Sequence, residues 1–127
     1  MAFNIKIRTA DKLFSQYIRE RDKWTCQRCG KVHEKNSRNF GVSHYWGRKR
    51  ESTRFEPDNC VSLCNIPCHQ SWGHGDEKDA YREYMIRRLG QARFDSLMIQ
   101  ANTYKKRDDK MAIIYIKLLM ESLKGDV

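Results

Sequence analysis

Four cysteines and two histidines in the middle of the chain are candidate metal ligands and catalytic groups. The cysteines form two close pairs that lie far apart in sequence: Cys26 and Cys29, then Cys64 and Cys68. Thiolate pairs at these separations are typical ligands of a tetrahedral structural zinc ion. His44 lies between the pairs and His69 directly follows the second one. We therefore predict a Zn²⁺ site that fixes the segment carrying both histidines.

Phosphodiester hydrolysis needs a general base, a ligand for a divalent cation, and cationic side chains that hold the phosphate. Three residues in this segment are candidates for the first two roles and for holding the loop between them. His44 is the predicted base, because imidazole titrates near neutral pH. His69 is the predicted metal ligand, because its neighbour Cys68 would hold it in place. Asn59 lies between them, where its amide could hydrogen-bond the loop that carries His44. We predict His44, Asn59 and His69 as catalytic residues.

The charge of the chain favours a polyanionic partner. Lys and Arg together number 25 against 16 Asp and Glu, which gives a net charge of +9 with His neutral. A basic surface of this size is typical of proteins that bind nucleic acid. A cluster of basic residues follows the predicted base, and we predict that it binds DNA: Arg48, Lys49, Arg50 and Arg54.

Cysteine usage and hydropathy bear on the compartment. The count of five cysteines is odd, which argues against a disulfide framework and favours the reducing cytoplasm. The fifth, Cys60, alternates with apolar residues and is predicted to be a small core residue. No apolar run approaches the length of a membrane span, and the first residues lack the apolar core of a signal peptide. We expect a cytoplasmic protein that is neither exported nor membrane-bound.

Periodicity predicts an α+β fold in one domain, residues 1–127. Helices are predicted over 10–22, from 69 onward, and over 76–89, 91–100 and 108–123, with short strands at 41–46 and 59–63. The stretch 47–56 is predicted to be irregular. The last helix carries an apolar stripe that we expect to face the core: Met111, Ile114, Tyr115, Leu118 and Leu119. Trp46 and Trp72 are predicted to cover the small zinc core, and stacking on bases is the alternative.

A family resemblance is carried by short motifs spread over about residues 13–75. They are Tyr17-Ile-Arg-x-Arg-Asp, Cys26-Gln-Arg-Cys29-Gly30, Ser43-His44-Tyr45 with Arg48, Arg54-Phe55 with Asn59, and Leu63-Cys64-x-x-x-Cys68-His69. This pattern resembles the HNH endonucleases of the zinc-bound, four-cysteine type and is similar to the phage NinG (Rap) recombination nucleases. The resemblance implies a small ββα-metal core at about 24–75, preceded by one helix and followed by a helical extension at about 76–124.

The resemblance also implies roles. His44 would be the general base, Asn59 would fix the hairpin, and His69 would bind a catalytic Mg²⁺ or Mn²⁺. Arg48 and Arg54 would contact phosphate, since a guanidinium suits that role. His74 could complete the metal site, although five residues on a regular helix separate the two side chains onto different faces. The substrate would be DNA, nicked or branched, and a homodimer built through the C-terminal helices is a further expectation.

One departure from the family pattern and two other functions keep the assignment open. Many family members carry Asp or His immediately before the base, whereas this chain has Ser43, and a neutral hydroxyl is a poor metal ligand. A non-catalytic zinc-ribbon DNA-binding protein would keep the four cysteines and the positive charge without needing His44. A structural zinc adaptor would bind protein through the C-terminal helices. A small HNH protein of phage packaging or restriction is the alternative within the enzyme class.

Overall fold

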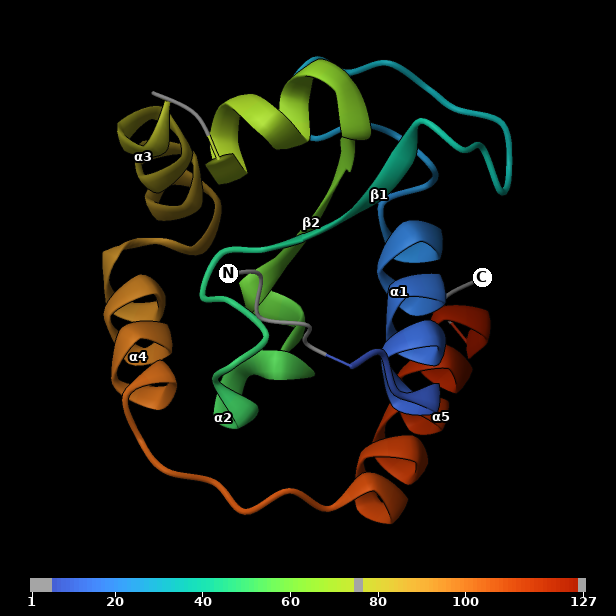
Figure 1. Ribbon diagram of the computed structural model, residues 1–127, viewed down its shortest axis with the longest axis vertical. Helices are drawn as coiled ribbons and strands as arrows, with labels where there is room; N and C mark the ends of the chain where they lie inside the picture. Colours follow the sequence, from blue (N-terminus) through green and yellow to red (C-terminus); the bar gives the residue numbers. More distant parts are fainter. Residues whose placement is uncertain (1–5, 75–76, 126–127) are drawn as a thin grey trace.

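The computed structural model describes residues 6–74 and 77–125, the side chain of His74 excepted (Figure 1). A small sheet lies between two groups of helices, with α3 and α4 on one side and α1 and α5 on the other. The elements, in chain order, are α1 (Thr9–Arg21), β1 (Phe40–His44), α2 (Glu51–Arg54), a 3-10 turn (Pro57–Asn59), β2 (Cys60–Cys64), η2 (Asn65–His74), α3 (Lys78–Leu89), α4 (Gln91–Ala101) and α5 (Asp109–Gly125).

The sheet consists of two antiparallel strands, and β2 leads directly into the helix η2. In its register, His44 lies opposite Cys60 and Phe40 lies opposite Cys64. Every residue of β2 is buried, which explains why its sequence, Cys-Val-Ser-Leu-Cys, contains no charge. The predicted mixed helix-and-strand composition and the two predicted strands are therefore confirmed, each within one or two residues.

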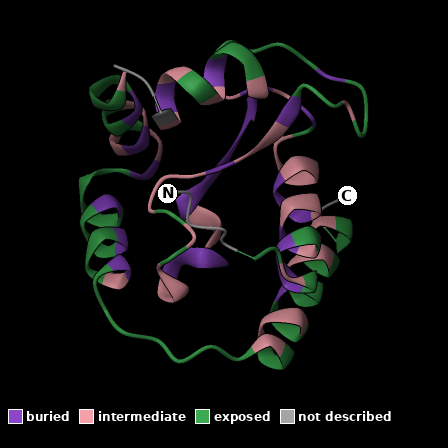
Figure 2. Cartoon of the chain, in the orientation of Figure 1, coloured by how far each residue is buried: buried purple, intermediate pink, exposed green. Residues whose placement is uncertain are grey.

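Two groups of buried side chains lie on the two sides of the sheet. The cysteine-side cluster includes Trp24, Phe40, Leu63, Trp72 and Met85, and it surrounds three of the four paired cysteines. The α1–α5 cluster consists of Ala10, Phe14, Tyr17, Ile18, Phe55, Cys60 and Ile116. Cys60 is fully buried, which confirms the prediction of a core residue, and Trp72 is buried as the predicted cover. Figure 2 shows β2 buried along its length while α5 alternates between exposed and half-buried residues.

Helix α5 corrects the sequence prediction about which of its faces packs. Four residues of the stripe predicted to be core are largely exposed: Met111 is 59% exposed, Ile114 49%, Tyr115 43% and Leu118 63%. The fifth, Leu119, is partly buried and packs against the α1–α5 cluster, as predicted. Ile116, which the prediction left out, is instead fully buried against α1. The error has a physical cause, since α5 is apolar around most of its circumference and its periodicity therefore does not single out one face.

Two boundaries near the site also differ from prediction. The stretch 47–56, predicted to be irregular, contains the short helix α2. The helix predicted from His69 begins earlier, at Asn65, and it is a π-helix with an extended residue at Ile66. The predicted start of the next helix, Asp76, lies outside the described residues, and α3 begins at Lys78.

Candidate metal centre and histidine site

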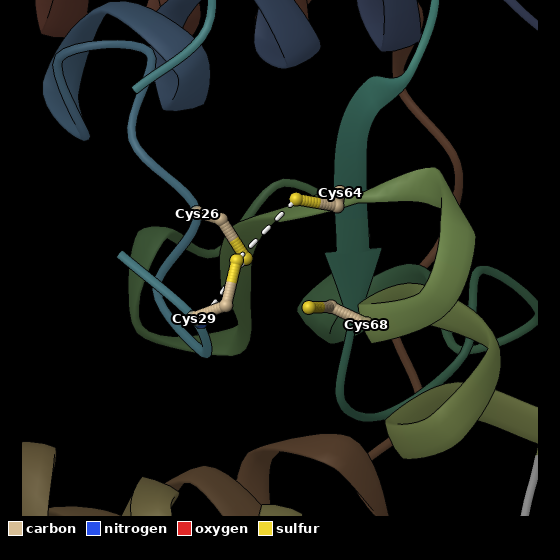
Figure 3. Close-up of side chains that lie close together, drawn as sticks. All are labelled: Cys26, Cys29, Cys64 and Cys68. Atoms are coloured by element: carbon tan, nitrogen blue, oxygen red, sulfur yellow. Dashed lines mark hydrogen bonds between the residues drawn. The ribbon is translucent and has the colours of Figure 1, made fainter. Parts of the chain in front are cut away.

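The four paired cysteines converge on one point. Cys26 and Cys29 lie in the turn after α1, Cys64 ends β2, and Cys68 lies in η2. Their sulfur atoms all lie within 4.8 Å of one another, and Figure 3 shows them facing a common centre. Four thiolates from two such pairs match the donor set of a structural zinc site. The cluster could hold a metal ion, as the sequence predicted.

Hydrogen bonds and charge around the sulfurs favour a bound cation. The amide of Cys29 donates to Cys26 Sγ (3.4 Å), and Arg28 Nη1 donates to Cys68 Sγ (3.3 Å). Burial raises the pKa of the Cys64 thiol, and the neighbouring sulfurs raise it further, to about 12. Burial also opposes ionisation of Cys26, but backbone hydrogen bonds outweigh it and lower the Cys26 pKa to about 7. Because four thiolates this close repel one another, a dication is the species that lets all of them ionise.

His33 is a member of this site that the sequence analysis missed. Its Nε2 lies 3.1 Å from Cys64 Sγ, and its ring stacks on Phe40 at 4.7 Å between centroids. The imidazole is 8% exposed although it lies in an otherwise exposed loop. An imidazole N–H directed at a ligating sulfur stabilises the thiolate form. The sequence did place His33 four residues after Cys29, but a histidine at that spacing does not by itself predict a hydrogen bond to a cysteine ligand.

One ring nitrogen of His44 is hydrogen-bonded to the backbone, which fixes the orientation of the imidazole. It ends β1, its ring lies 6.3 Å from that of Phe14, and its Nε2 lies 3.0 Å from the carbonyl oxygen of Arg54. Since a carbonyl oxygen only accepts, Nε2 carries the proton and Nδ1 keeps its lone pair. Burial lowers the pKa of His44 and the positive charge of Arg48 lowers it further, to about 4. The imidazole is therefore neutral at pH 7 and able to accept a proton at Nδ1.

Asn59 ties together the loop that follows His44. Its Oδ1 accepts from the amide of Trp46 (2.8 Å), and its Nδ2 donates to the carbonyls of Trp46 (2.9 Å) and Thr53 (3.1 Å). The side chain is fully buried, so these bonds are shielded from water. The structure thus places Asn59 where it fixes the backbone between β1 and β2, as the sequence predicted for this residue.

His69 lies in η2, on the segment that Cys68 ties to the cysteine cluster. A Cβ added at Gly73 would lie 3.2 Å from His69 Cδ2, so the glycine leaves room for the imidazole. Because a π-helix bonds residues five apart, positions 69 and 74 lie one turn apart rather than on the different faces expected for an α-helix. The side chain of His74 lies outside the described residues. Ser43, the residue before the base, is buried and accepts a hydrogen bond from Tyr81 Oη (2.9 Å).

Comparison with known protein families settles the relationship of the chain. The model of the family described as Bacteriophage Lambda NinG protein matches residues 4–124. The chain belongs to the NinG family. Neither the comparison with curated proteins nor the comparison with solved structures found a match.

The basic residues predicted to bind DNA have different environments in this NinG-family chain. Lys49 is exposed and Arg48 is partly exposed. Arg50 stacks over Trp46 (5.0 Å) and donates to the carbonyl of Ala101 (3.1 Å). These placements leave Lys49 exposed and Arg48 partly exposed in the loop that follows His44, while Arg50 connects the loop to α4.

Arg54 is not placed for the phosphate contact that the sequence suggested. Its guanidinium is buried and donates to both carboxylate oxygens of Asp11, at 2.9 and 2.6 Å. It also donates to the carbonyls of Arg48 and Lys6 (both 3.1 Å). Because these bonds occupy its donors, Arg54 joins α1 to the loop, and its own carbonyl orients His44.

No other cluster of metal ligands appears among residues 6–74 and 77–125. The four cysteines are the only group there of three or more His, Cys, Asp or Glu side chains placed to share an ion. Across the same residues, no helix is long and apolar enough to cross a membrane. The NinG-family chain therefore offers a four-cysteine cluster that could hold a metal ion and, separately, the oriented, neutral His44.

Proposed function

We propose that this NinG-family protein is an HNH-type DNA endonuclease that hydrolyses phosphodiester bonds. The observation that carries the proposal is the state of His44: neutral, oriented by the Arg54 carbonyl, and with its Nδ1 lone pair unprotonated. A histidine in this state is suited to general-base catalysis. The two strands that lead into η2, with Asn59 fixing their connection, agree with the ββα arrangement that the resemblance implies.

In the proposed reaction, His44 takes a proton from water at Nδ1 and the resulting hydroxide attacks phosphorus in line. The bond from phosphorus to the 3′ oxygen breaks, and the leaving 3′ oxygen takes up a proton from solvent. A pKa near 4 makes the free imidazole a weak base. Burial is the main cause of that low value, and the positive charge of Arg48 lowers it further. A DNA phosphate beside Arg48 would offset this charge and raise the pKa of His44 toward neutrality, where a base is most effective. Substrate binding would thus strengthen the base at the moment it is needed.

A catalytic Mg²⁺ or Mn²⁺ is part of the proposal. A divalent cation would stabilise negative charge on the phosphate. His69 is its proposed ligand, and the π-helix brings position 74 one turn away. The remaining donors fit this ion poorly: Ser43 is buried and bonded to Tyr81, and among the described residues His69 belongs to no group of three or more His, Cys, Asp or Glu side chains placed to share an ion.

The proposed substrate is nicked or branched DNA in the phage-infected host cell, as the resemblance to NinG recombination nucleases implies. The net charge of +9 and the basic residues Arg48 and Lys49 support a nucleic-acid substrate. A homodimer that brings two sites to two strands belongs to the same proposal. It would be built through the C-terminal helices.

A non-catalytic zinc-ribbon DNA-binding protein is the second candidate function. It is favoured by one observation, the Ser43–Tyr81 hydrogen bond, which occupies the position where many HNH enzymes carry a metal ligand. Such a protein would need the cysteine cluster and the basic surface, but it would not need an oriented histidine.

A cleavage assay separates the two functions. Supercoiled plasmid and a four-way junction would be incubated with the parent protein, His44→Ala and His44→Gln, each with EDTA, Mg²⁺ or Mn²⁺. Glutamine is the informative variant, because its amide can still donate to the Arg54 carbonyl but cannot act as a base. We expect metal-dependent cleavage by the parent and a loss of about 10²–10⁴-fold in both variants. Zinc content and thermal melting confirm that each variant is folded.

Two results would count against the proposal. Full cleavage by folded His44→Gln would remove His44 from the base role. Bound but uncut DNA with every metal would favour the zinc-ribbon function.

A further inference from the structure

A small basic pocket lies beside the loop that follows His44. Its volume is about 210 Å³ and it is lined by residues of the N-terminal segment, α1 and that loop: Ile7, Asp11, Lys12, Ser15, Arg19 and Arg48. Three of these side chains are cationic and one is anionic. Neither Lys12 nor Arg19 was among the DNA-binding residues predicted from sequence, because single basic residues on a helix are usually just solvated.

The one carboxylate in the pocket is already neutralised. Both oxygens of Asp11 accept from Arg54, and Oδ2 also accepts from the backbone amide of Arg8 (2.8 Å). The Asp11 side chain is only 1% exposed. Since Arg54 pairs with both of its oxygens, the three cations give the pocket an excess of positive charge. Arg48 lies 3.9 Å from Asp11, close to the limit of an ion pair, and Arg19 donates to Gln16 (3.3 Å) and lies over the Trp24 ring (5.2 Å).

Arg48 has hydrogen-bonding capacity that the described residues do not use. Its Nε is buried and has no hydrogen-bond partner among them, and the nearest Asp11 oxygen is 3.9 Å away. Arg19 Nε is likewise buried without a partner in the described part of the chain. The backbone of Arg48 is nevertheless fixed, because its carbonyl accepts from Arg54 (3.1 Å). Because the Nε atoms are buried, a ligand in the pocket would be met by the exposed part of the Arg48 guanidinium, whose side chain is 29% exposed. A guanidinium on a fixed backbone is suited to a bound oxyanion.

We propose that Lys12, Arg19 and Arg48 form a phosphate-binding pocket that takes a backbone phosphate of the DNA strand next to the one attacked at His44. The pocket is large enough for one phosphodiester group, and the hydroxyl of Ser15 adds a neutral donor. Its position beside the base follows from Phe14, which lies between these α1 residues in sequence and contacts the His44 ring. That the ligand is DNA rests on the proposed function; that it is a phosphate rests on the pocket.

The test measures DNA binding without cleavage. A fluorescein-labelled duplex and a labelled four-way junction would be titrated at several salt concentrations, without added Mg²⁺ or Mn²⁺ and without a chelator that could remove the zinc. Each phosphate contact on duplex DNA contributes about 0.9 to the slope of log affinity against log salt. Lys12→Gln and Arg48→Gln should each lower the slope on duplex by about one contact, equally for different DNA sequences.

Matched controls come from exposed residues of the same types on other elements. Arg87→Gln on α3 and Lys117→Gln on α5 should leave the slope unchanged, since both positions lie outside the pocket. Zinc content and melting temperature establish that each variant is folded. Lys12 is exposed on α1, so Lys12→Gln reports on the pocket even if Arg48→Gln fails to fold.

The outcomes separate this proposal from the nuclease proposal. Unchanged slopes in folded Lys12→Gln and Arg48→Gln would overturn the pocket, whether or not the protein cuts DNA. Lowered slopes with no cleavage by the parent would support the pocket and count against the nuclease. A further arm adds inorganic phosphate at constant ionic strength and follows the Arg side-chain Nε–H resonances. Shifts there with unchanged DNA slopes would make free phosphate the ligand and overturn the assignment to DNA.

Discussion

The cysteine-side cluster and the α1–α5 cluster are stabilised by different interactions. On the cysteine side, the ligands come from a turn, a strand end and a π-helix, connected by a long irregular stretch in which Val32 is 70% exposed. On the other side, two helices pack through apolar side chains, and a buried ion pair joins α1 to the loop before β2. The difference is that the four cysteines, which could hold a metal ion, lie where regular structure is scarce.

His44 lies between the cysteine-side cluster and the α1–α5 cluster. Its strand partner Cys60 and its ring contact Phe14 belong to the α1–α5 cluster, whereas β1 begins at Phe40 in the cysteine-side cluster. Breaking one side or the other should therefore disturb the histidine through different routes.

Loss of the zinc site should have the largest effect. Structural zinc contributes about 10 kcal/mol or more of apparent free energy in small zinc-binding peptides, and that free energy is coupled to folding. We expect Cys64→Ser to lose stoichiometric zinc and to lose the near-ultraviolet signal of Trp24 and Trp72, which pack in the same cluster. Metal analysis and circular dichroism measure both effects, and a strong zinc chelator added to the parent should reproduce them.

Cys60→Ala is the matched control for this prediction. Cys60 is fully buried in the α1–α5 cluster, and burial raises the pKa of its thiol well above the usual range, as expected for a structural cysteine. The variant should keep one zinc per chain and lose only modest stability. If Cys64→Ser kept its zinc while Cys60→Ala lost it, the ligand assignment would be wrong.

Asp11→Ala should have the next largest effect, on the other side of the molecule. It leaves the Arg54 guanidinium buried without its carboxylate, a change that typically costs about 3–5 kcal/mol. Arg93→Ala, which breaks the more exposed pair with Asp58, should cost no more than about 1 kcal/mol. Urea denaturation compares the two variants. Equal small losses would mean that the Asp11–Arg54 pair does not hold α1 to the loop.

The same ion pair predicts a dependence on pH. Burial opposes ionisation of Asp11, but hydrogen bonds from Arg54 and from the Arg8 amide outweigh it, so the pKa of Asp11 lies below its usual value. A depressed carboxylate pKa contributes stability above the unfolded-state value of about 3.9 and loses it as the pH falls through the folded-state value. The stability gap between the parent and Asp11→Ala should therefore be constant near neutrality and narrow in acid below about pH 4.

The sequence predicted the cysteine side better than the α1–α5 side for physical reasons. Metal-ligand spacing is a local code, so Cys26 and Cys68 could be assigned without knowing the fold. The hydrogen bond from Asn59 to the loop that follows His44 could likewise be predicted from the position of Asn59 between the two histidines in the sequence. The ion pair of Arg54 with Asp11 joins residues 43 apart in sequence, and the spacing of two charged residues does not predict such a contact. His33 escaped notice for the same reason, since its contact with Cys64 depends on how a loop returns.

Helix α5 gives the smallest and sharpest test, because two isomeric side chains on it lie in opposite environments. Ile116 is fully buried against α1, whereas Leu118 is 63% exposed. Ile116→Ala should cost about 2–5 kcal/mol, the range for emptying a core site. Leu118→Ala should change the free energy of unfolding by less than about 0.5 kcal/mol. Urea denaturation at two protein concentrations measures both.

A loss of stability in Leu118→Ala that grows with protein concentration would mean that a second copy covers this face, as the proposed homodimer requires. Sedimentation of the variant would then show a shift toward monomer. A loss at Leu118 that equals that at Ile116 and is independent of concentration would instead reverse the assignment of the two faces of α5.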